Sequence, residues 1–322
     1  MRKKAISIIT YLFLTATLIL TCTGICAAED ASVFVNKGDE YLKQSQIEEA
    51  KQQYEQAWKQ TPDLEAVLRT KMGVFLTQKQ QWLGAAEQFQ KASELNPQNL
   101  VIHFNLANVY ASMDMIDKGI EEYRKILEIQ PNLYWAEFNM SNLYKEQGNL
   151  EQAIVHCKNA LKINGKLAPV HFSLAGLYEE ITLIDEAIEE YKVAIGLDPK
   201  FSKAYYNLGV VYLKQHNLDD AFDLFNKAIE VNPGYAEAYI NMGAIKMYQK
   251  TPEQAIPYFE KGIGLNPPNK GGALVNISVA YRNIKNYDKA LEYALQAQKL
   301  EYKPADALIR SIEKLKSKKD EK

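Results

Sequence analysis

The sequence repeats itself with a period of 34 residues. The period is marked most clearly by prolines, whose successive spacings are 35, 34, 68, 34 and 34 residues: Pro62, Pro97, Pro131, Pro199, Pro233 and Pro267. Gly165 lies midway across the double spacing. Proline stops a helix, and a fixed period of this length is typical of helical repeats. The chain is therefore predicted to be a stack of helical hairpins.

Residues 202–235 show the plan of one unit. A first set of apolar and small residues has the spacing of one helix face: Tyr205, Leu208, Gly209 and Tyr212. After a polar turn, a second set again has helical spacing: Ala221, Phe225 and Ala228. Pro233 then prevents the second helix from continuing. The pattern predicts helix, turn, helix and stop within each unit.

Three positions of this unit recur in register along the chain. Position 8 is small in every unit: Gly38, Gly73, Ala107, Ser141, Ala175, Gly209, Gly243 and Ser278. Position 20 is also small: Ala50, Ala85, Gly119, Ala153, Ala187, Ala221, Ala255 and Ala290. Position 24 is mostly aromatic: Tyr54, Phe89, Tyr123, Cys157, Tyr191, Phe225, Phe259 and Ala294. Small residues where two helices cross, with rings between the helices, are what close hairpin packing requires.

In these positions the chain resembles the tetratricopeptide-repeat (TPR) proteins. The resemblance implies an all-α fold, a right-handed superhelical solenoid of eight helix-turn-helix repeats with a C-terminal capping helix. We expect a solenoid over residues 29–304, with a capping helix and charged tail over residues 305–322. The repeats are predicted at 31–64, 66–99, 100–133, 134–167, 168–201, 202–235, 236–269 and 271–304. An apolar stripe predicts that the capping helix covers the last repeat: Leu308, Ile309, Ile312 and Leu315.

Residues 1–28 do not belong to the repeats. Three basic residues at 2–4 are followed by an uncharged apolar run at 6–20 and by small residues before Glu29. This order predicts a secretory signal peptide, and therefore an exported protein that is periplasmic or secreted. The alternative is an uncleaved N-terminal anchor, with residues 6–20 in the inner membrane.

Two repeats depart from the pattern. In the fourth, Cys157 replaces the aromatic residue, and we expect it to be a buried small apolar group. In the seventh, Pro257 lies inside the second helix, where it removes one backbone hydrogen bond. We expect the stack of hairpins to bend or open between the seventh and eighth repeats.

No motif of a catalytic, metal or phosphate site is present in the sequence. The four histidines do not have the spacing of zinc ligands, and His103 and His171 share a repeat position but lie two repeats apart. The 38 basic and 40 acidic residues leave no basic excess for a nucleic acid. We expect a protein that is not an enzyme, with no cofactor, no metal and no nucleic-acid partner.

The resemblance implies that the first helix of each repeat lines a concave groove. Position 6, which faces this groove in the family, is asparagine in six of eight repeats: Asn36, Asn105, Asn139, Asn207, Asn241 and Asn276. Asparagine is a poor helix former, and its amide both donates and accepts hydrogen bonds. Such amides could pair with the backbone of an extended peptide. The alternative is that each asparagine bonds locally to its neighbouring repeat.

This row of asparagines is similar to the ladder in the TPR superhelix of glycosyltransferases that modify protein serine and threonine, although the sequence has no counterpart of the catalytic domain. Aromatic residues and two further amides accompany it on the first helices: Phe104, Phe138, Phe172, Tyr206, Trp135, Asn108 and Asn142. Rings beside amides are typical of binding hot spots. The alternative is that the rings pack between adjacent first helices as core.

Two functions follow from these residues. The first is a non-catalytic scaffold of the cell envelope that binds extended peptide segments of a partner protein in its concave groove. The second is a structural subunit of an envelope secretion or polysaccharide-export complex that docks through its convex face or its ends. Contact with a membrane is expected only through residues 6–20, if these are not cleaved.

Overall fold

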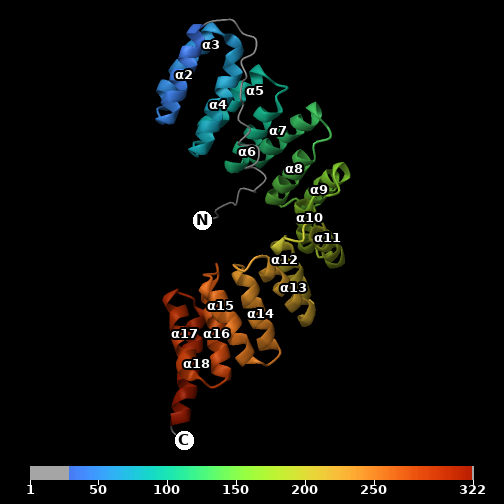
Figure 1. Cartoon of the computed structure of the whole chain (residues 1–322), viewed down its shortest axis with the longest axis vertical. Coiled ribbons are helices and arrows are strands. Elements are labelled where there is room, and N and C mark those ends of the chain that lie inside the picture. Colours follow the sequence, from blue (N-terminus) through green and yellow to red (C-terminus); the bar gives the residue numbers. More distant parts are fainter. Residues whose placement is uncertain (1–28, 321–322) are drawn as a thin grey trace. The chain divides into compact units, whose positions relative to one another are not determined.

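The computed structural model describes residues 29–320, and the expected export signal lies outside them. This part of the chain contains seventeen α-helices and one short 3-10 helix, and no strand (Figure 1). The predicted all-α fold of consecutive helix-turn-helix pairs is confirmed. None of the helices in residues 29–320 has the length and apolarity needed to cross a membrane. The chain divides into two compact units, and the division in the sequence falls between Met113 and Asp114.

The helices of the first unit cover two hairpins and the first helix of the third repeat. Their bounds are α2 Glu29–Lys43, α3 Ile47–Gln60, η1 Pro62–Leu64, α4 Glu65–Gln78, α5 Trp82–Leu95 and α6 Leu100–Ser112. The second unit begins with the second helix of the third repeat. Its helices are α7 Ile116–Ile129, α8 Tyr134–Gln147, α9 Leu150–Ile163, α10 Ala168–Glu180, α11 Ile184–Leu197, α12 Ser202–Lys214, α13 Leu218–Val231, α14 Ala236–Tyr248, α15 Pro252–Gly264, α16 Lys270–Asn283, α17 Tyr287–Lys299 and α18 Pro304–Asp320.

In the four repeats with glycine at position 8, a ring on the second helix fills the space above that glycine on the first helix. A Cβ atom added to Gly209 would lie 2.8 Å from Cε1 of Phe225, and one added to Gly243 would lie 2.7 Å from Cδ1 of Phe259. Both rings are fully buried. Glycine is required at position 8 of these repeats because the ring occupies the place of a side chain.

The two repeats without a ring at position 24 have serine at position 8 instead of glycine. The Ser141 hydroxyl donates to the Ala153 carbonyl at 2.7 Å and lies 3.0 Å from Sγ of Cys157. The Ser278 hydroxyl donates to the Ala290 carbonyl at 2.6 Å. The hydroxyl occupies part of the space that a ring fills elsewhere, and its hydrogen bond avoids a buried polar group without a partner.

Cys157 is the small buried group that the sequence predicts. The side chain is fully buried, and burial raises the pKa of the thiol to about 11. Because the thiolate is the reactive form, this cysteine should be inert while the hairpin is folded.

Each turn between the two helices of a repeat contains one residue with left-handed backbone. In the fourth repeat this residue is Gly148, with φ of 84°. In the other repeats it is not glycine: Ser45, Gln80, Asp114, Thr182, His216, Lys250 and Lys285. Residues with a Cβ atom adopt this conformation at a cost of roughly 1 kcal/mol. Seven of the eight turns therefore carry some backbone strain.

The last helix closes the second unit as the sequence predicts. Leu308, Ile309 and Ile312 of α18 are buried in a core cluster with Ile277 of α16 and Ala294 of α17. Leu315 lies near the end of the stripe and is 38% exposed. The helix thus covers the apolar face that the eighth repeat would otherwise present to water.

The opening expected between the seventh and eighth repeats is wrong, because side chains of both repeats pack in one core cluster. Helix α15 is continuous from Pro252 to Gly264 with Pro257 inside it, and Phe259 shares the core cluster of α16. The lost hydrogen bond would have joined the Pro257 nitrogen to the Glu253 carbonyl. Both residues are exposed, so water can hydrate this carbonyl and the helix tolerates the proline.

Replacing a strained turn residue by glycine should stabilise the protein. Lys250 has φ of 60°, and Lys250→Gly should raise the free energy of unfolding by about 0.5–1 kcal/mol because glycine adopts this backbone freely. The reverse change, Gly148→Ala, should lower it by a similar amount. Urea unfolding followed by circular dichroism measures both. A lower urea midpoint for Lys250→Gly than for the wild type would contradict the strain.

Candidate functional site

The six asparagines at position 6 differ in their bonding. In the first unit, Asn36 is exposed, and Asn105 donates to the Val101 carbonyl of its own helix at 2.8 Å. In the second unit, Asn207 donates to the Tyr191 hydroxyl and Asn241 to the Tyr206 hydroxyl, both at 3.3 Å. Asn276 is exposed. Local bonding therefore accounts for one N–H group each of Asn105, Asn207 and Asn241.

Helix α8 carries two half-buried amides, Asn139 and Asn142, whose hydrogen-bonding groups are not used within the described residues. Trp135 precedes them on the same helix face, four and seven residues away. These three half-buried side chains form one stripe along α8.

The aromatic residues at position 5 are divided between core and surface. Phe104 is 9% exposed and Phe138 only 5%, so these two rings are core residues. Phe172 and Tyr206 are half-buried. Phe172 packs 4.9 Å from Phe201 between ring centroids, and Tyr206 packs 4.8 Å from Tyr235. Asn108, in the first unit, is half-buried.

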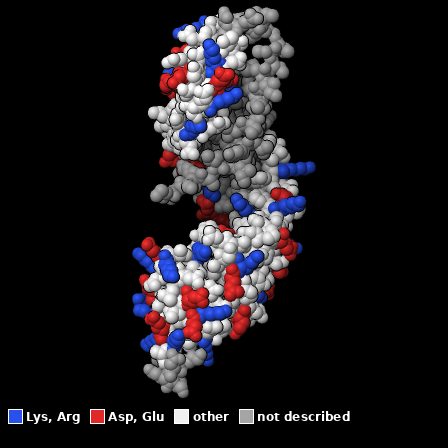
Figure 2. Space-filling model, turned by 60° about the vertical axis from the view of Figure 1, so that its left-hand side comes forward, with Lys and Arg blue, Asp and Glu red and all other residues white. Residues whose placement is uncertain are grey.

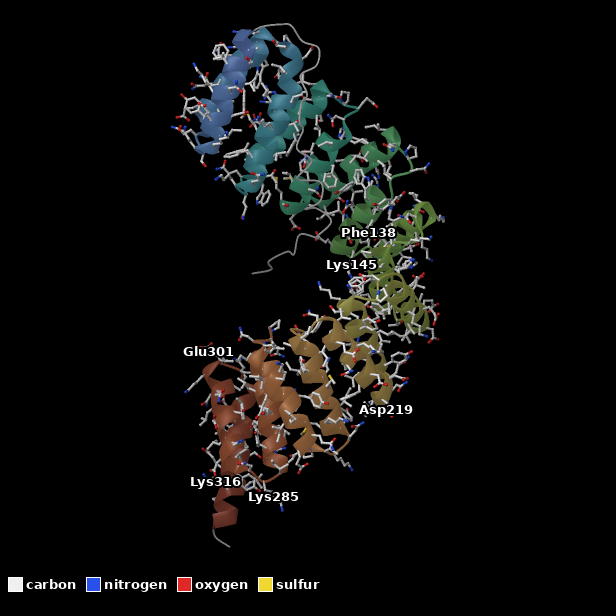
Figure 3. All side chains as sticks on the ribbon, in the orientation of Figure 1. Phe138, Lys145, Asp219, Lys285, Glu301 and Lys316 are labelled. Atoms are coloured by element: carbon white, nitrogen blue, oxygen red, sulfur yellow. The ribbon has the colours of Figure 1, made fainter. Side chains whose placement is uncertain are left out.

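A polar network on α10, α11 and α12 was not predicted from the sequence. The Tyr191 hydroxyl donates to Glu179 at 2.7 Å, and Lys214 donates to the other carboxylate oxygen at 3.2 Å. Lys145 of α8 pairs with Glu180 at 2.6 Å. Lys145 lies seven residues after Phe138 on α8, and both residues are labelled in Figure 3. Glu179 and Lys145 both occupy position 12 of their repeats, on first helices, and this shared position was the signal available in the sequence.

Comparison with family models assigns the chain. A tetratricopeptide repeat model matches residues 31–63, 100–133, 138–167, 236–269 and 271–304, and a second matches 202–235. A TPR repeat model matches 75–114 and 184–216. Together the matches cover more than half of the sequence. The chain belongs to the tetratricopeptide repeat family.

Solved structures of other TPR proteins share the fold. The protein is similar to pilF of Pseudomonas aeruginosa, with 21% identity, a TM-score of 0.56 and coverage of 65% of this chain and 96% of that chain. It is also similar to a tetratricopeptide repeat protein of Parabacteroides merdae, with 19% identity, a TM-score of 0.55 and coverage of 79% and 99%. These likenesses concern the fold alone. A search of the curated proteins gave no match.

TPR proteins bind other proteins and peptides, and they are generally non-catalytic scaffolds. The fold of this TPR protein fits a protein–protein interaction scaffold. Among the residues that Figure 2 draws in colour or white, acidic and basic side chains are interspersed, and no large region carries one sign. Within the part of the chain that the structure describes, no group of three or more His, Cys, Asp or Glu residues is placed to hold a metal ion.

The network around Tyr191 predicts how stability depends on pH. Burial, and next the hydrogen bond to Glu179, raise the pKa of Tyr191 above its ordinary value of 10.0. The folded state therefore retains a proton that the unfolded chain loses, so the free energy of unfolding should fall as pH rises above about 10. The urea concentration at the midpoint of unfolding should be lower at pH 11 than at pH 8.

The variant Tyr191→Phe isolates this contribution. It should lower the midpoint at pH 8, because it removes the hydrogen bonds of the hydroxyl, and it should lose less stability between pH 8 and 11 than the wild type. Tyr248→Phe, whose ring is 66% exposed, is the control. Equal losses for Tyr191→Phe and the wild type would refute the contribution of Tyr191.

Proposed function

We propose that this protein is a non-catalytic scaffold that binds extended peptide segments of a partner protein along the first helices of its repeats. The observation that carries the proposal is the stripe of Trp135, Asn139 and Asn142 on α8. Each amide has two N–H donors and one carbonyl acceptor, and these are the groups that pair with a peptide backbone. Trp135 adds a large ring that loses little conformational entropy on binding.

The other position 6 asparagines of the second unit extend the same row. Asn207 and Asn241 each use one N–H group on a tyrosine hydroxyl, which leaves a second N–H group and the carbonyl oxygen for a ligand. Their local bonds orient the amides, and an oriented amide loses less entropy when a peptide binds. Bonding to a neighbouring repeat and binding a peptide are therefore compatible roles in the second unit.

The rings contribute unequally to this proposed site. Phe104 and Phe138 are buried and hold helices together, so their removal would test folding more than binding. Trp135, Phe172 and Tyr206 retain partial exposure and are the candidates for contact with a ligand. The proposed binding row in the second unit thus consists of Trp135, Asn139, Asn142, Phe172, Tyr206, Asn207, Asn241 and Asn276.

We further propose that the scaffold acts in the cell envelope. The support is the sequence of residues 1–28, with its basic start, apolar run and small residues before Glu29. Fractionation of cells that express the full chain tests this location. Recovery in the periplasm or in the membrane fraction supports it, and recovery in the cytoplasm alone contradicts it.

Selection from a library of random linear peptides tests the binding function. We expect selected peptides to be unstructured when free and to bind residues 29–322 with a measurable Kd. The double variant Asn139→Ala and Asn142→Ala should weaken binding at least about fivefold, since each lost hydrogen bond contributes roughly 1 kcal/mol. Asn226→Ala is the matched control, because Asn226 lies on a second helix and pairs with Glu230.

The result that opposes the proposal is equally specific. If a natural partner is captured as well by the double variant as by the wild type, and both are folded by circular dichroism, the amides of α8 do not bind it. The partner would then dock elsewhere, and a subunit of an envelope assembly would be the better description.

A further inference from the structure

The connection between the fourth and fifth repeats contains the one asparagine in the sequence that is followed by glycine. Asn164 and Gly165 lie between α9 and α10, beyond the last helical residue of α9. In three other repeats the corresponding asparagine is followed by proline: Asn96, Asn232 and Asn266. Proline has no backbone N–H group, so the residue after the asparagine has an N–H group only in the fourth repeat of these four.

The turn at Asn164 closely resembles the proline-containing turn of the sixth repeat. Its φ and ψ angles are −146° and 103°, and those of Asn232 are −132° and 92°. Oδ1 of Asn164 accepts a hydrogen bond from the Lys166 backbone N–H at 3.0 Å, and Oδ1 of Asn232 accepts one from the Gly234 N–H at 3.1 Å. Gly165 therefore takes the place of a proline in a turn of the same kind.

The backbone nitrogen of Gly165 is available for reaction with the neighbouring side chain. Gly165 is exposed, and within residues 29–320 its N–H group has no hydrogen-bond partner. Glycine has no Cβ atom to hinder the approach of the nitrogen to the Asn164 amide. The Lys166 N–H polarises the carbonyl of that amide and can stabilise the negative charge that forms on Oδ1 when a nucleophile adds.

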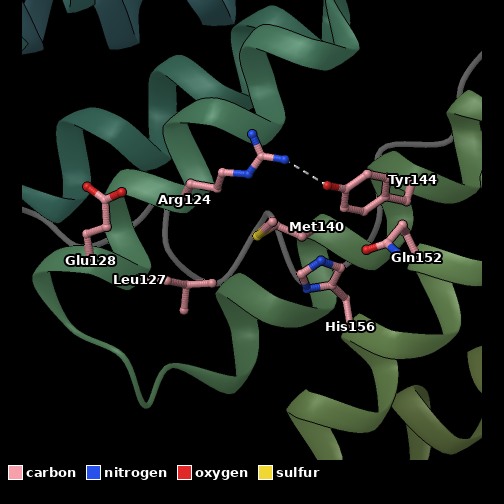
Figure 4. Close-up of a pocket in the computed structure, with 7 residues that line it drawn as sticks. All are labelled: Arg124, Leu127, Glu128, Met140, Tyr144, Gln152 and His156. Carbon is pink, nitrogen blue, oxygen red and sulfur yellow. Dashed lines mark hydrogen bonds between the residues drawn. The ribbon is translucent and has the colours of Figure 1, made fainter.

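The asparagine inside α9 does not have this freedom. Asn159 lies within the helix and donates to Glu137 of α8 at 3.3 Å. The same carboxylate lies 2.6 Å from Nδ1 of His156, whose ring stacks on Tyr144 with 5.1 Å between the centroids, and both rings are drawn in Figure 4. These contacts fix the middle of α9 to α8, so Asn159 is an internal control for Asn164.

We propose that Asn164 is a site of spontaneous modification, at which water converts the side-chain amide to a carboxylate. The Gly165 nitrogen attacks Cγ of Asn164 and closes a cyclic imide. The bond from Cγ to Nδ2 breaks, and ammonia leaves with the proton of the Gly165 N–H. Water then opens the imide at Cγ to give aspartate, or at the main-chain carbonyl to give isoaspartate. Nothing is oxidised or reduced, and the inference does not depend on the proposed function.

Both products alter the connection between the two repeats. The Gly165 carbonyl oxygen lies 3.1 Å from Nε2 of His171 on α10. Isoaspartate adds one carbon atom to the main chain before Gly165, so this contact cannot keep its geometry. Aspartate places a negative charge beside the C-terminal end of α9, where the helix dipole is also negative. Modification should therefore lower the urea midpoint of unfolding.

Incubation of the folded full chain at mildly alkaline pH, followed by mass spectrometry, tests the proposal. An endoproteinase that cuts after glutamate releases residues 152–179, which contain Asn159 and Asn164. We expect this peptide to gain one mass unit at Asn164 and to separate into two products, while Asn159 stays unchanged. The reaction should be faster at higher pH, because the attacking nitrogen must lose its proton.

Two variants exchange the chemistry between the matched turns. Gly165→Pro removes the N–H group and should abolish the modification. Proline fits there, because Asn164 has extended backbone and a Cβ atom on Gly165 would lie 3.6 Å from the Leu161 carbonyl oxygen, an ordinary contact. Pro233→Gly places an N–H group after Asn232 and should create a second modified site.

Three results would overturn the proposal. The first is an unmodified Asn164 in wild-type protein that circular dichroism shows to be folded. The second is equal modification of Asn164 in Gly165→Pro, which would indicate direct hydrolysis of the side chain without the Gly165 nitrogen. The third is an unmodified Asn232 in folded Pro233→Gly.

Discussion

Each hairpin depends on one contact between its two helices. The residue at position 8 of the first helix must fit the space beside the residue at position 24 of the second. Where position 24 is a phenylalanine, position 8 is glycine, as in Gly209 with Phe225. Where position 24 is cysteine or alanine, position 8 is a serine whose hydroxyl bonds back to the second helix. The two solutions fill the same space with different atoms. Full burial of a phenylalanine side chain contributes roughly 1.5–3 kcal/mol, so this contact is a large part of what one hairpin can gain by itself.

Everything else in the structure follows from closing the hairpins in this way. Once the small residue and its partner fix the two helices, the turn must reverse the chain in few residues, and a left-handed residue such as Lys250 is accepted despite its cost. The remaining apolar faces are buried against the next hairpin, and α18 covers the last of them. The first-helix positions that no packing contact uses are then available for polar residues, and on α8 these are Asn139 and Asn142.

The sequence was sufficient to predict the repeats, the helix pairs and the capping helix, because proline spacing and small residues report directly on packing. It did not predict the left-handed residues, since only Gly148 among them is a glycine and local sequence gives no signal for the others. It also missed Glu179, whose role arises from Tyr191 and Lys214 on other helices. The effect of Pro257 was predicted wrongly, because it depends on whether water can hydrate the Glu253 carbonyl, which loses its hydrogen bond. The roles of the predicted site residues stay a prediction, and the burial of Phe138 shows why: position 5 can serve either core or surface.

A double-mutant cycle in the fourth repeat tests the central claim most directly. Cys157→Phe alone should destabilise the protein, because the ring meets the Ser141 side chain, and Ser141→Gly alone should leave a space and lose its hydrogen bond. The double variant recreates the glycine and phenylalanine of the sixth repeat and should be more stable than the sum of the single changes by at least about 1 kcal/mol. Urea unfolding of the four proteins measures this coupling. Additive effects would contradict the account, because they would mean that the two positions do not share one space.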